Sequence, residues 1–164
     1  MLARRPYSVA ELRRALERKF PENAAIADAL ARLRELGYLD DKKFAEHFAS
    51  SLARNKSFGR YRVTRELKSK LVNFKHIEPA IQRAYEETDE RKLLEKVLEK
   101  KVRALRLPLT RPKLAALCQS LLRRGFAADA IMKAVRARPE LKPVAEEADL
   151  TALEEGDGGQ SSKL

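Results

Sequence analysis

The sequence is poor in the residues that build disulfide-linked or metal-bound domains. Its 164 residues include one cysteine, Cys118, two histidines and no tryptophan. A lone cysteine excludes an internal disulfide framework and a thiolate metal cluster, and it suits a reducing cytosol. His47 and His76 lie 29 positions apart, and neither has a Cys or second His at ligand spacing. The sequence therefore predicts no metal site.

Motifs that carry catalysis are also missing. The sequence contains no glycine-rich phosphate loop, no HExxH motif, and no Ser or Cys in a nucleophile signature. Asp40 and Asp41 directly precede an apolar-periodic segment, so capping of a helix is a better interpretation than an acid/base pair. Cys118 flanks an apolar stripe and is expected to be packed rather than reactive. We expect no catalytic residue, no cofactor and a function in binding.

Long apolar runs are absent too. No run approaches the roughly 20 residues that a membrane span requires. The charges at Arg4 and Arg5 have no apolar signal core behind them. We therefore expect a cytoplasmic protein that is not inserted in a membrane.

Glycine is scarce, and strong helix formers take its place. Only 6 glycines are present, mostly near segment edges or in the C-terminal tail, while Ala, Leu, Arg, Lys and Glu dominate. A charged fraction of 36% with 44% apolar residues is typical of a folded chain with a charge-rich surface. This composition predicts an all-α protein.

One apolar spacing occurs three times. Four apolar residues separated by 4, 10 and 4 positions recur at shifts of 51 and 54 residues. The three sets are Leu12, Leu16, Ile26 and Leu30; Val63, Leu67, Ile77 and Ile81; and Leu117, Leu121, Ile131 and Val135. Each set predicts two helices whose i, i+4 pairs face each other across a short turn. Since one such hairpin buries too little apolar surface, neighbouring units are expected to stack.

A third helix completes the predicted unit. Apolar stripes follow the first hairpin at Phe44 and Phe48, and the second at Leu94 and Leu98, whereas the pattern after the third fades near Pro139. The prediction is a stack of tandem three-helix repeats. Its boundaries are residues 1–56, 57–107, 108–142 for a truncated third repeat, and 143–164 for an acidic, partly disordered tail.

Local signals place several helix ends. Ser8 and Glu11 form a predicted capping box, in which the hydroxyl accepts from the third helical N–H and the carboxylate reaches back to the Ser8 amide. Asp40 is the predicted cap of the third helix, and Gly37 ends the helix before it. Pro79 falls inside the fifth helix by repeat register, so that helix either starts late, near Glu78, or kinks.

The charge is unevenly placed. Residues 1–142 contain 34 basic and 18 acidic side chains, a net +16, whereas residues 143–164 contain 1 basic and 6 acidic, a net −5. A positive field of this size favours an elongated polyanion such as nucleic acid or a nucleoprotein, or an anionic membrane surface. Simple solubility is the alternative explanation.

The strongest candidate surface runs over residues 54–70. If Val63 and Leu67 point inward, Tyr61, Arg65 and Lys68 point outward on the opposite face. An exposed ring among cations can stack on a base or anchor a protein, although many such runs are only solvated helix faces. The candidate binding residues are Arg54, Lys56, Arg60, Tyr61, Arg62, Arg65, Lys68, Arg103, Arg106, Arg123 and Arg124.

Three segments together resemble a known family. They are LRELGYLDDKKFA at residues 33–45, SLARNKSFGRYRVTRELKSK at residues 51–70 and LLRRGF at residues 121–126. They resemble the RecX family of bacterial recombinase regulators over about residues 4–138. The first motif is fairly specific and the last is generic.

The resemblance implies a curved, elongated array of three three-helix repeats that docks along the groove of the RecA–DNA filament. Its implied effect is to limit filament growth or promote filament loss, and so to damp ATP hydrolysis and strand exchange. Weaker, non-specific binding to single- or double-stranded DNA and a monomeric state go with this interpretation. A general nucleic-acid-binding protein, and an adaptor for an unrelated protein, remain alternatives from other classes.

Two departures from the family pattern matter. Family members usually close the fourth helix with a glycine in a left-handed cap, and Leu71 stands there. The acidic tail lies outside the resemblance, and it could fold back on the basic face as a competitor.

Overall fold

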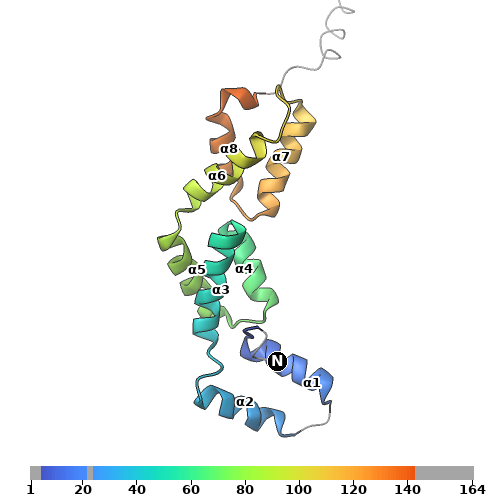
Figure 1. Cartoon of the computed structure of the whole chain (residues 1–164), viewed down its shortest axis with the longest axis vertical. Helices are drawn as coiled ribbons and strands as arrows, with labels where there is room; N and C mark the ends of the chain where they lie inside the picture. Colours follow the sequence, from blue (N-terminus) through green and yellow to red (C-terminus); the bar gives the residue numbers. More distant parts are fainter. Residues whose placement is uncertain (1–4, 22–23, 143–164) are drawn as a thin grey trace, which may run out of the picture.

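The computed structural model describes residues 5–21 and 24–142, and all regular elements in that part of the chain are helical (Figure 1). The α-helices are α1 (Val9–Lys19), α2 (Ile26–Glu35), α3 (Asp41–Lys56), α4 (Arg60–Ser69), α5 (Phe74–Glu87), α6 (Glu90–Val102), α7 (Arg111–Arg123) and α8 (Ala128–Arg136). A short 3₁₀ helix, η1 (Pro139–Leu141), follows α8. The predicted disorder and fold-back of the acidic tail concern residues outside the described part.

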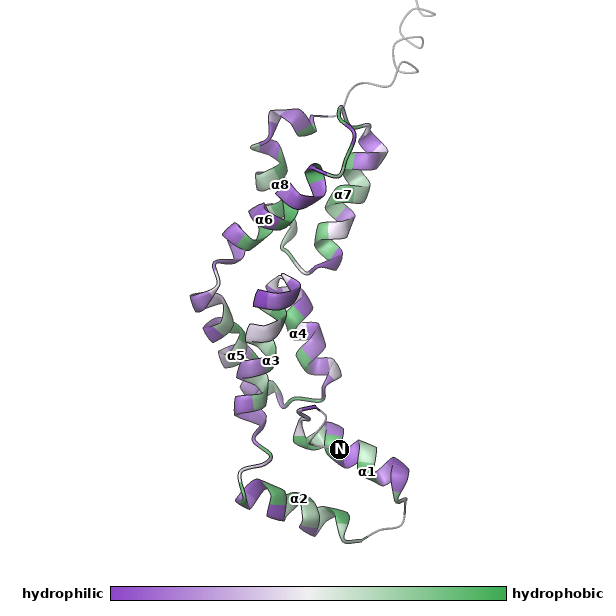
Figure 2. Ribbon diagram, in the orientation of Figure 1, coloured by the Kyte–Doolittle hydropathy of each residue, from purple (hydrophilic) through white to green (hydrophobic). Residues whose placement is uncertain are grey.

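The helices form an elongated array around two apolar cores (Figures 1 and 2). A small core at one end joins α1 and α2 through Val9, Leu12, Leu30 and Leu39. The larger core runs continuously from α3 to η1. Within it, α3 packs on α4 and α5, and α6 packs on α7 and α8. We call these parts the N-terminal group (α1 and α2), the middle group (α3 to α5) and the last group (α6 to α8).

The repeated apolar spacing marks the inward positions, as predicted. Val63, Leu67 and Leu121 are fully buried, and Ile77, Ile81, Leu117, Ile131 and Val135 are also buried in the large core. In the first set Leu12 and Leu30 are buried, while Leu16 and Ile26 are half-buried against them. The prediction of an all-α fold built from repeated helical units is therefore confirmed.

Most predicted helix ends are observed, with two corrections. The Ser8 hydroxyl accepts from the Glu11 amide at 3.1 Å, and the Asp40 carboxylate accepts from the Lys43 amide at 3.0 Å. The Glu11 carboxylate, however, accepts from Arg5 and Lys70, because two cations outcompete a neutral amide for it. The late start of the fifth helix near Glu78 is wrong: α5 begins at Phe74, since Asn73 caps it, and Pro79 lies inside it.

Left-handed residues end four of the described helices. The φ angles are +75° at Gly37 after α2, +52° at Ser57 after α3, +57° at Leu71 after α4 and +89° at Gly125 after α7. After Leu71, the Val72 amide donates to the Leu67 carbonyl at 3.3 Å, which closes the turn between α4 and α5. Leu71 therefore adopts the left-handed conformation that the sequence led us to expect of a glycine.

Candidate functional site

The outward face of α4 presents the predicted aromatic and basic side chains. Val63 and Leu67 on its inward face are fully buried, whereas Tyr61 is 70% exposed and Arg65 and Lys68 are also exposed. The structure thus places Tyr61, Arg65 and Lys68 on one solvent face, as the helical wheel predicted. We call these three residues the α4 face.

Three other predicted cations contact nearby carboxylates. Arg54 pairs with Glu87 on α5. The Arg60 guanidinium lies 3.1 Å from Glu90 and over the Tyr85 ring, and its backbone amide also donates to Glu90 at 2.8 Å. Arg62 pairs with Glu66 at 2.7 Å and covers the Phe58 ring. The charges of these arginines are partly neutralised, so they are weaker candidates for binding than Arg65 and Lys68.

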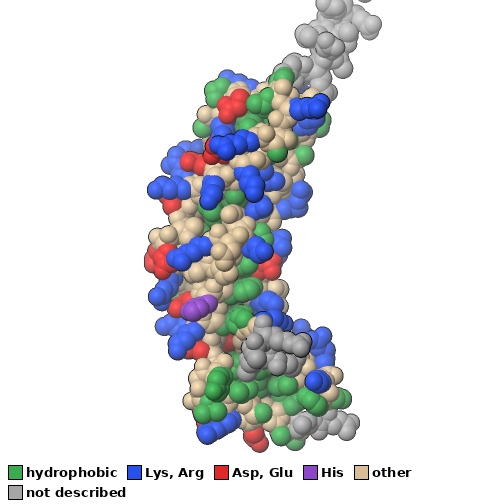
Figure 3. Space-filling view, viewed as in Figure 1, with side chains coloured by type: hydrophobic (Ala, Val, Ile, Leu, Met, Phe, Trp, Pro, Cys, Tyr) green, Lys and Arg blue, Asp and Glu red, His purple; other side chains and the backbone are tan. Residues whose placement is uncertain are grey.

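The remaining candidates lie toward the last group. Lys56, Arg106 and Arg123 are exposed, and Arg103 pairs with Glu99 one turn earlier on α6. Residues 91–142 contain 15 basic and 4 acidic side chains, so this end carries most of the excess positive charge. Lysine and arginine side chains are distributed along the molecule in Figure 3 rather than gathered in one patch. Such a distribution suits an extended anionic partner.

Arg124 holds two groups of helices together. Its guanidinium donates to the backbone carbonyls of Lys56 at 2.9 Å and Ser57 at 3.4 Å, at the end of α3. The Gly59 amide donates back to the Arg124 carbonyl at 2.8 Å, and the Tyr61 amide donates to the Gly125 carbonyl at 3.2 Å. The turn between α7 and α8 therefore caps the N-terminus of α4, and we call this contact the glycine joint.

The glycine joint requires the absence of side chains. A Cβ atom on Gly59 would lie 2.4 Å from the Gly125 carbonyl oxygen, and a Cβ atom on Gly125 would lie 2.2 Å from the backbone nitrogen of Arg62. Two of the segments that carry the family resemblance thus meet across the joint. The contact is made by residues 57–60 (SFGR) of the second segment and residues 123–126 (RRGF) of the third. Sequence reasoning missed this role, although a glycine in each segment was the available signal.

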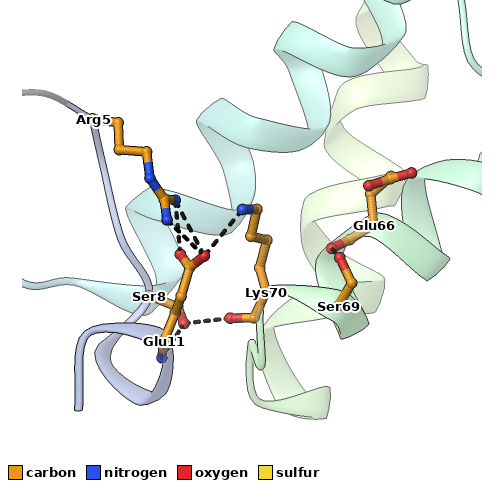
Figure 4. A network of polar contacts seen from close by, with 6 residues as sticks. All are labelled: Arg5, Ser8, Glu11, Glu66, Ser69 and Lys70. Atoms are coloured by element: carbon orange, nitrogen blue, oxygen red, sulfur yellow. Dashed lines mark hydrogen bonds and ion pairs between the residues drawn. The ribbon is translucent and has the colours of Figure 1, made fainter. Parts of the chain in front are cut away.

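A second joint connects the N-terminal group to the middle group by polar contacts (Figure 4). The Ser8 hydroxyl donates to the Lys70 carbonyl, and the Glu11 carboxylate accepts from Arg5 at 3.1 Å and from Lys70 at 3.0 Å. The Val9 amide donates to the Asp41 carboxylate at 2.8 Å. We call this contact the polar joint.

The polar joint lowers the pKa of Glu11. Partial burial raises the pKa of this carboxyl, but the hydrogen bonds and charges of Arg5 and Lys70 outweigh burial and hold it below its ordinary value. The contacts of the polar joint therefore favour the ionised form of Glu11.

Metal binding, thiol reactivity and membrane insertion find little support in the described residues. No group of three or more potential metal ligands occurs among the residues that the structure describes. Burial raises the pKa of the Cys118 thiol, which reduces its reactivity. None of the helices in residues 5–21 and 24–142 is long and apolar enough to cross a membrane.

Two family models match the first half of the chain. Residues 1–33 match the family model described as the first three-helix domain of RecX, and residues 40–81 match its second three-helix domain. The second match begins at Asp40, the N-cap of α3, and ends inside α5.

Curated relatives match over most of the chain. The chain is 35% identical over 136 residues to regulatory protein RecX of Chlorobaculum tepidum, which covers 83% of this chain and 82% of the relative. It is 30% identical over 159 residues to regulatory protein RecX of Thermobifida fusca, covering 95% and 83% respectively.

The fold is also similar to a solved structure. The crystal structure of RecX from Lactobacillus salivarius superimposes with a TM-score of 0.69 at 20% identity, covering 83% of this chain and 88% of that one. With the tandem helical groups, the two matching domain models and the curated relatives taken together, this chain belongs to the RecX family of regulatory proteins.

Proposed function

We propose that this chain binds the RecA–DNA filament in the cytoplasm as a monomer and modulates it, mainly by inhibition. The affected steps are filament assembly, ATP hydrolysis and strand exchange in DNA repair and recombination. Family membership supports the regulatory role. The observation that carries the proposal for a nucleoprotein partner is the elongated array with exposed cations on all its helical groups.

The shape and the charge of the array both suit this partner. A nucleoprotein filament presents phosphates and repeated protein surfaces along a groove, and a long array contacts several repeats at once. Cations spread along the array neutralise phosphates over that length, and each neutralised phosphate releases counterions. Because the two joints set the spacing of the helical groups, they also set the spacing of the cations.

The α4 face is the part of the site with the clearest exposure. Tyr61 supplies a ring for stacking or for a protein contact, and Arg65 and Lys68 follow it on the same face of α4. The same composition supports the second candidate function, a general nucleic-acid-binding protein without preference for RecA.

A recombinase assay separates the two candidates. RecA is assembled on single-stranded DNA, the protein is added at a sub-stoichiometric ratio, and ATP hydrolysis is followed. The proposal expects a progressive fall in hydrolysis, because blocking filament growth affects many RecA molecules per bound regulator. No fall at concentrations that bind naked DNA would favour the general binder.

A pair of charge-reversal variants tests the α4 face. The double variant Arg65→Glu, Lys68→Glu should weaken inhibition about tenfold or more, because two favourable contacts become repulsive. The control is Lys96→Glu, Lys100→Glu on α6, which changes the net charge equally at exposed positions outside the predicted site. Equal losses in both variants would mean that only net charge matters and that the α4 face is not the contact.

A further inference from the structure

Aromatic side chains gather in a groove between the N-terminal residues, the turn after α2, and α3. Tyr7, Tyr38, Phe44 and Phe48 line it, together with Arg5 and Lys43, and its volume is about 830 Å³. The whole sequence has 4 Tyr and 6 Phe, so this groove holds four of its ten aromatic residues. We call it the aromatic groove.

Packing in the apolar core explains the positions of some of these aromatic side chains but not of all. Phe44 is 8% exposed and belongs to the large core, and the Phe48 ring stacks on it with centroids 5.5 Å apart. Tyr38 differs, because its side chain is 69% exposed although it lines the groove. A ring that remains in water contributes little to folding, so core packing does not explain it.

The backbone beneath Tyr38 is fixed. Gly37 adopts φ +75°, and the Tyr38 amide donates to the Leu33 carbonyl at 2.9 Å, which completes the helix-ending turn. Tyr38 thus offers an exposed ring on an ordered turn. Such a ring loses little entropy when it stacks on a flat ligand.

The charged side chains around the groove leave one cation open to a ligand. The lining contains two basic side chains, Arg5 and Lys43, and one acid, Asp40. The Asp40 carboxylate caps α3 and lies 3.8 Å from the Lys43 ammonium, whose side chain is 78% exposed. Arg5 is paired with Glu11 and lies 3.9 Å from the centre of the Tyr7 ring. The cation most accessible to a ligand in the groove is therefore Lys43.

The exposed ring of Tyr38 favours a flat ligand, and Lys43 favours a ligand with a negative charge nearby. A nucleotide has both features. We propose that the aromatic groove binds an unpaired base of single-stranded DNA, which stacks on Tyr38 while Lys43 contacts the adjacent phosphate. Base stacking on exposed aromatics beside cations is a general mode of single-strand binding. This site goes beyond the proposed RecA contact, and it can be present whether or not the chain binds RecA.

A tryptophan reporter tests the stacking directly. Since the sequence has no tryptophan, Tyr38→Trp introduces a single indole at the groove. A thymidine oligomer should quench its fluorescence, whereas an abasic oligomer of equal length, which has phosphates and no bases, should not. The control is Phe74→Trp, because Phe74 is 74% exposed and lies outside the groove lining. Equal quenching by both oligomers at position 38 would overturn the proposal.

Affinity measurements complete the test, with oligomer anisotropy as the readout and no RecA present. Tyr38→Ala should lower affinity for the thymidine oligomer about fivefold or more and leave affinity for the abasic oligomer unchanged. Tyr38→Phe keeps the ring and should restore affinity, and Phe74→Ala should have no base-dependent effect. A Tyr38→Ala loss that is equal for both oligomers, or no loss at all, would show that the ring does not stack on bases.

Discussion

Replacing Gly125 with alanine tests whether backbone contact holds the middle and last groups together. A Cβ atom there would lie 2.2 Å from the Arg62 nitrogen and 2.4 Å from the Arg62 Cβ, well inside normal contact distance. The residue also has φ +89°, which costs an alanine roughly 1–2 kcal/mol. Displacing packed neighbours adds about 1–3 kcal/mol. We therefore expect Gly125→Ala to lower the free energy of unfolding by about 2–5 kcal/mol.

Two other glycines allow the cost of the left-handed backbone and the cost of close contact to be measured separately. Gly37 has φ +75°, and a Cβ atom there would have no neighbour within 4 Å, so Gly37→Ala should cost only the backbone part, about 1–2 kcal/mol. Gly59 has φ −82°, but its Cβ would lie 2.4 Å from the Gly125 oxygen, so Gly59→Ala should cost only the contact part, about 1–3 kcal/mol.

Urea unfolding followed by far-ultraviolet circular dichroism measures all three free energies by linear extrapolation. The expected order has Gly125→Ala as the most destabilised variant. If Gly125→Ala costs no more than Gly37→Ala, close contact across the glycine joint does not restrict the side chain at position 125, which contradicts the prediction.

Further predictions concern the polar joint and two turns. Because the pKa of Glu11 is lowered in the folded protein, its contribution to stability is complete above its ordinary pKa of 4.5 and is lost as the pH falls through the lowered value. Glu11→Gln should therefore reduce stability at neutral pH and flatten the acid side of the stability profile, as measured by urea titrations across pH. Leu71→Gly should raise the free energy of unfolding by about 0.5–1 kcal/mol, since it relieves a left-handed leucine that is 36% exposed; a lowered free energy of unfolding would show that the apolar contacts of Leu71 matter more. Tyr85→Phe should cost about 1–2 kcal/mol, because the Tyr85 hydroxyl donates to the Phe58 carbonyl at 2.5 Å and its loss leaves that acceptor unpaired; an unchanged melting temperature would contradict this.

Periodicity predicted the positions that face the core, because burial of one helix face is a local property of the sequence. Val63 and Leu67 followed from their spacing alone, and so did the outward direction of Tyr61. Ser8 and Asp40 were predictable for the same reason, since a cap needs only residues within one turn.

Contacts between groups were not predictable in this way. Nothing local indicates that Arg124 donates to the end of α3, or that Arg60 meets Glu90 thirty positions away. These pairings depend on how packed groups dock, and the docking depends on close approaches such as that of Gly59 to Gly125. A list of basic residues therefore mixes side chains that hold the fold with side chains that face solvent.

The aromatic groove shows the same limit. Phe44 and Phe48 fitted a core stripe by spacing, and Phe44 is indeed buried. Tyr38, however, joins them only because the turn after α2 lies beside α3, which no periodicity describes.

The two joints differ in chemistry, and this difference determines how each responds to conditions. The glycine joint consists largely of backbone hydrogen bonds and close backbone contact, which salt screens weakly. The polar joint depends on Glu11 with Arg5 and Lys70, and its side chains are 17–46% exposed, so salt and acid both weaken it. We therefore expect rising ionic strength to loosen the N-terminal group before it affects the junction of the middle and last groups. Hydrogen exchange at increasing salt measures this: amides of α1 should lose protection while those at the start of α4 keep it. Equal loss in both places would mean that the charged contacts do not hold the N-terminal group.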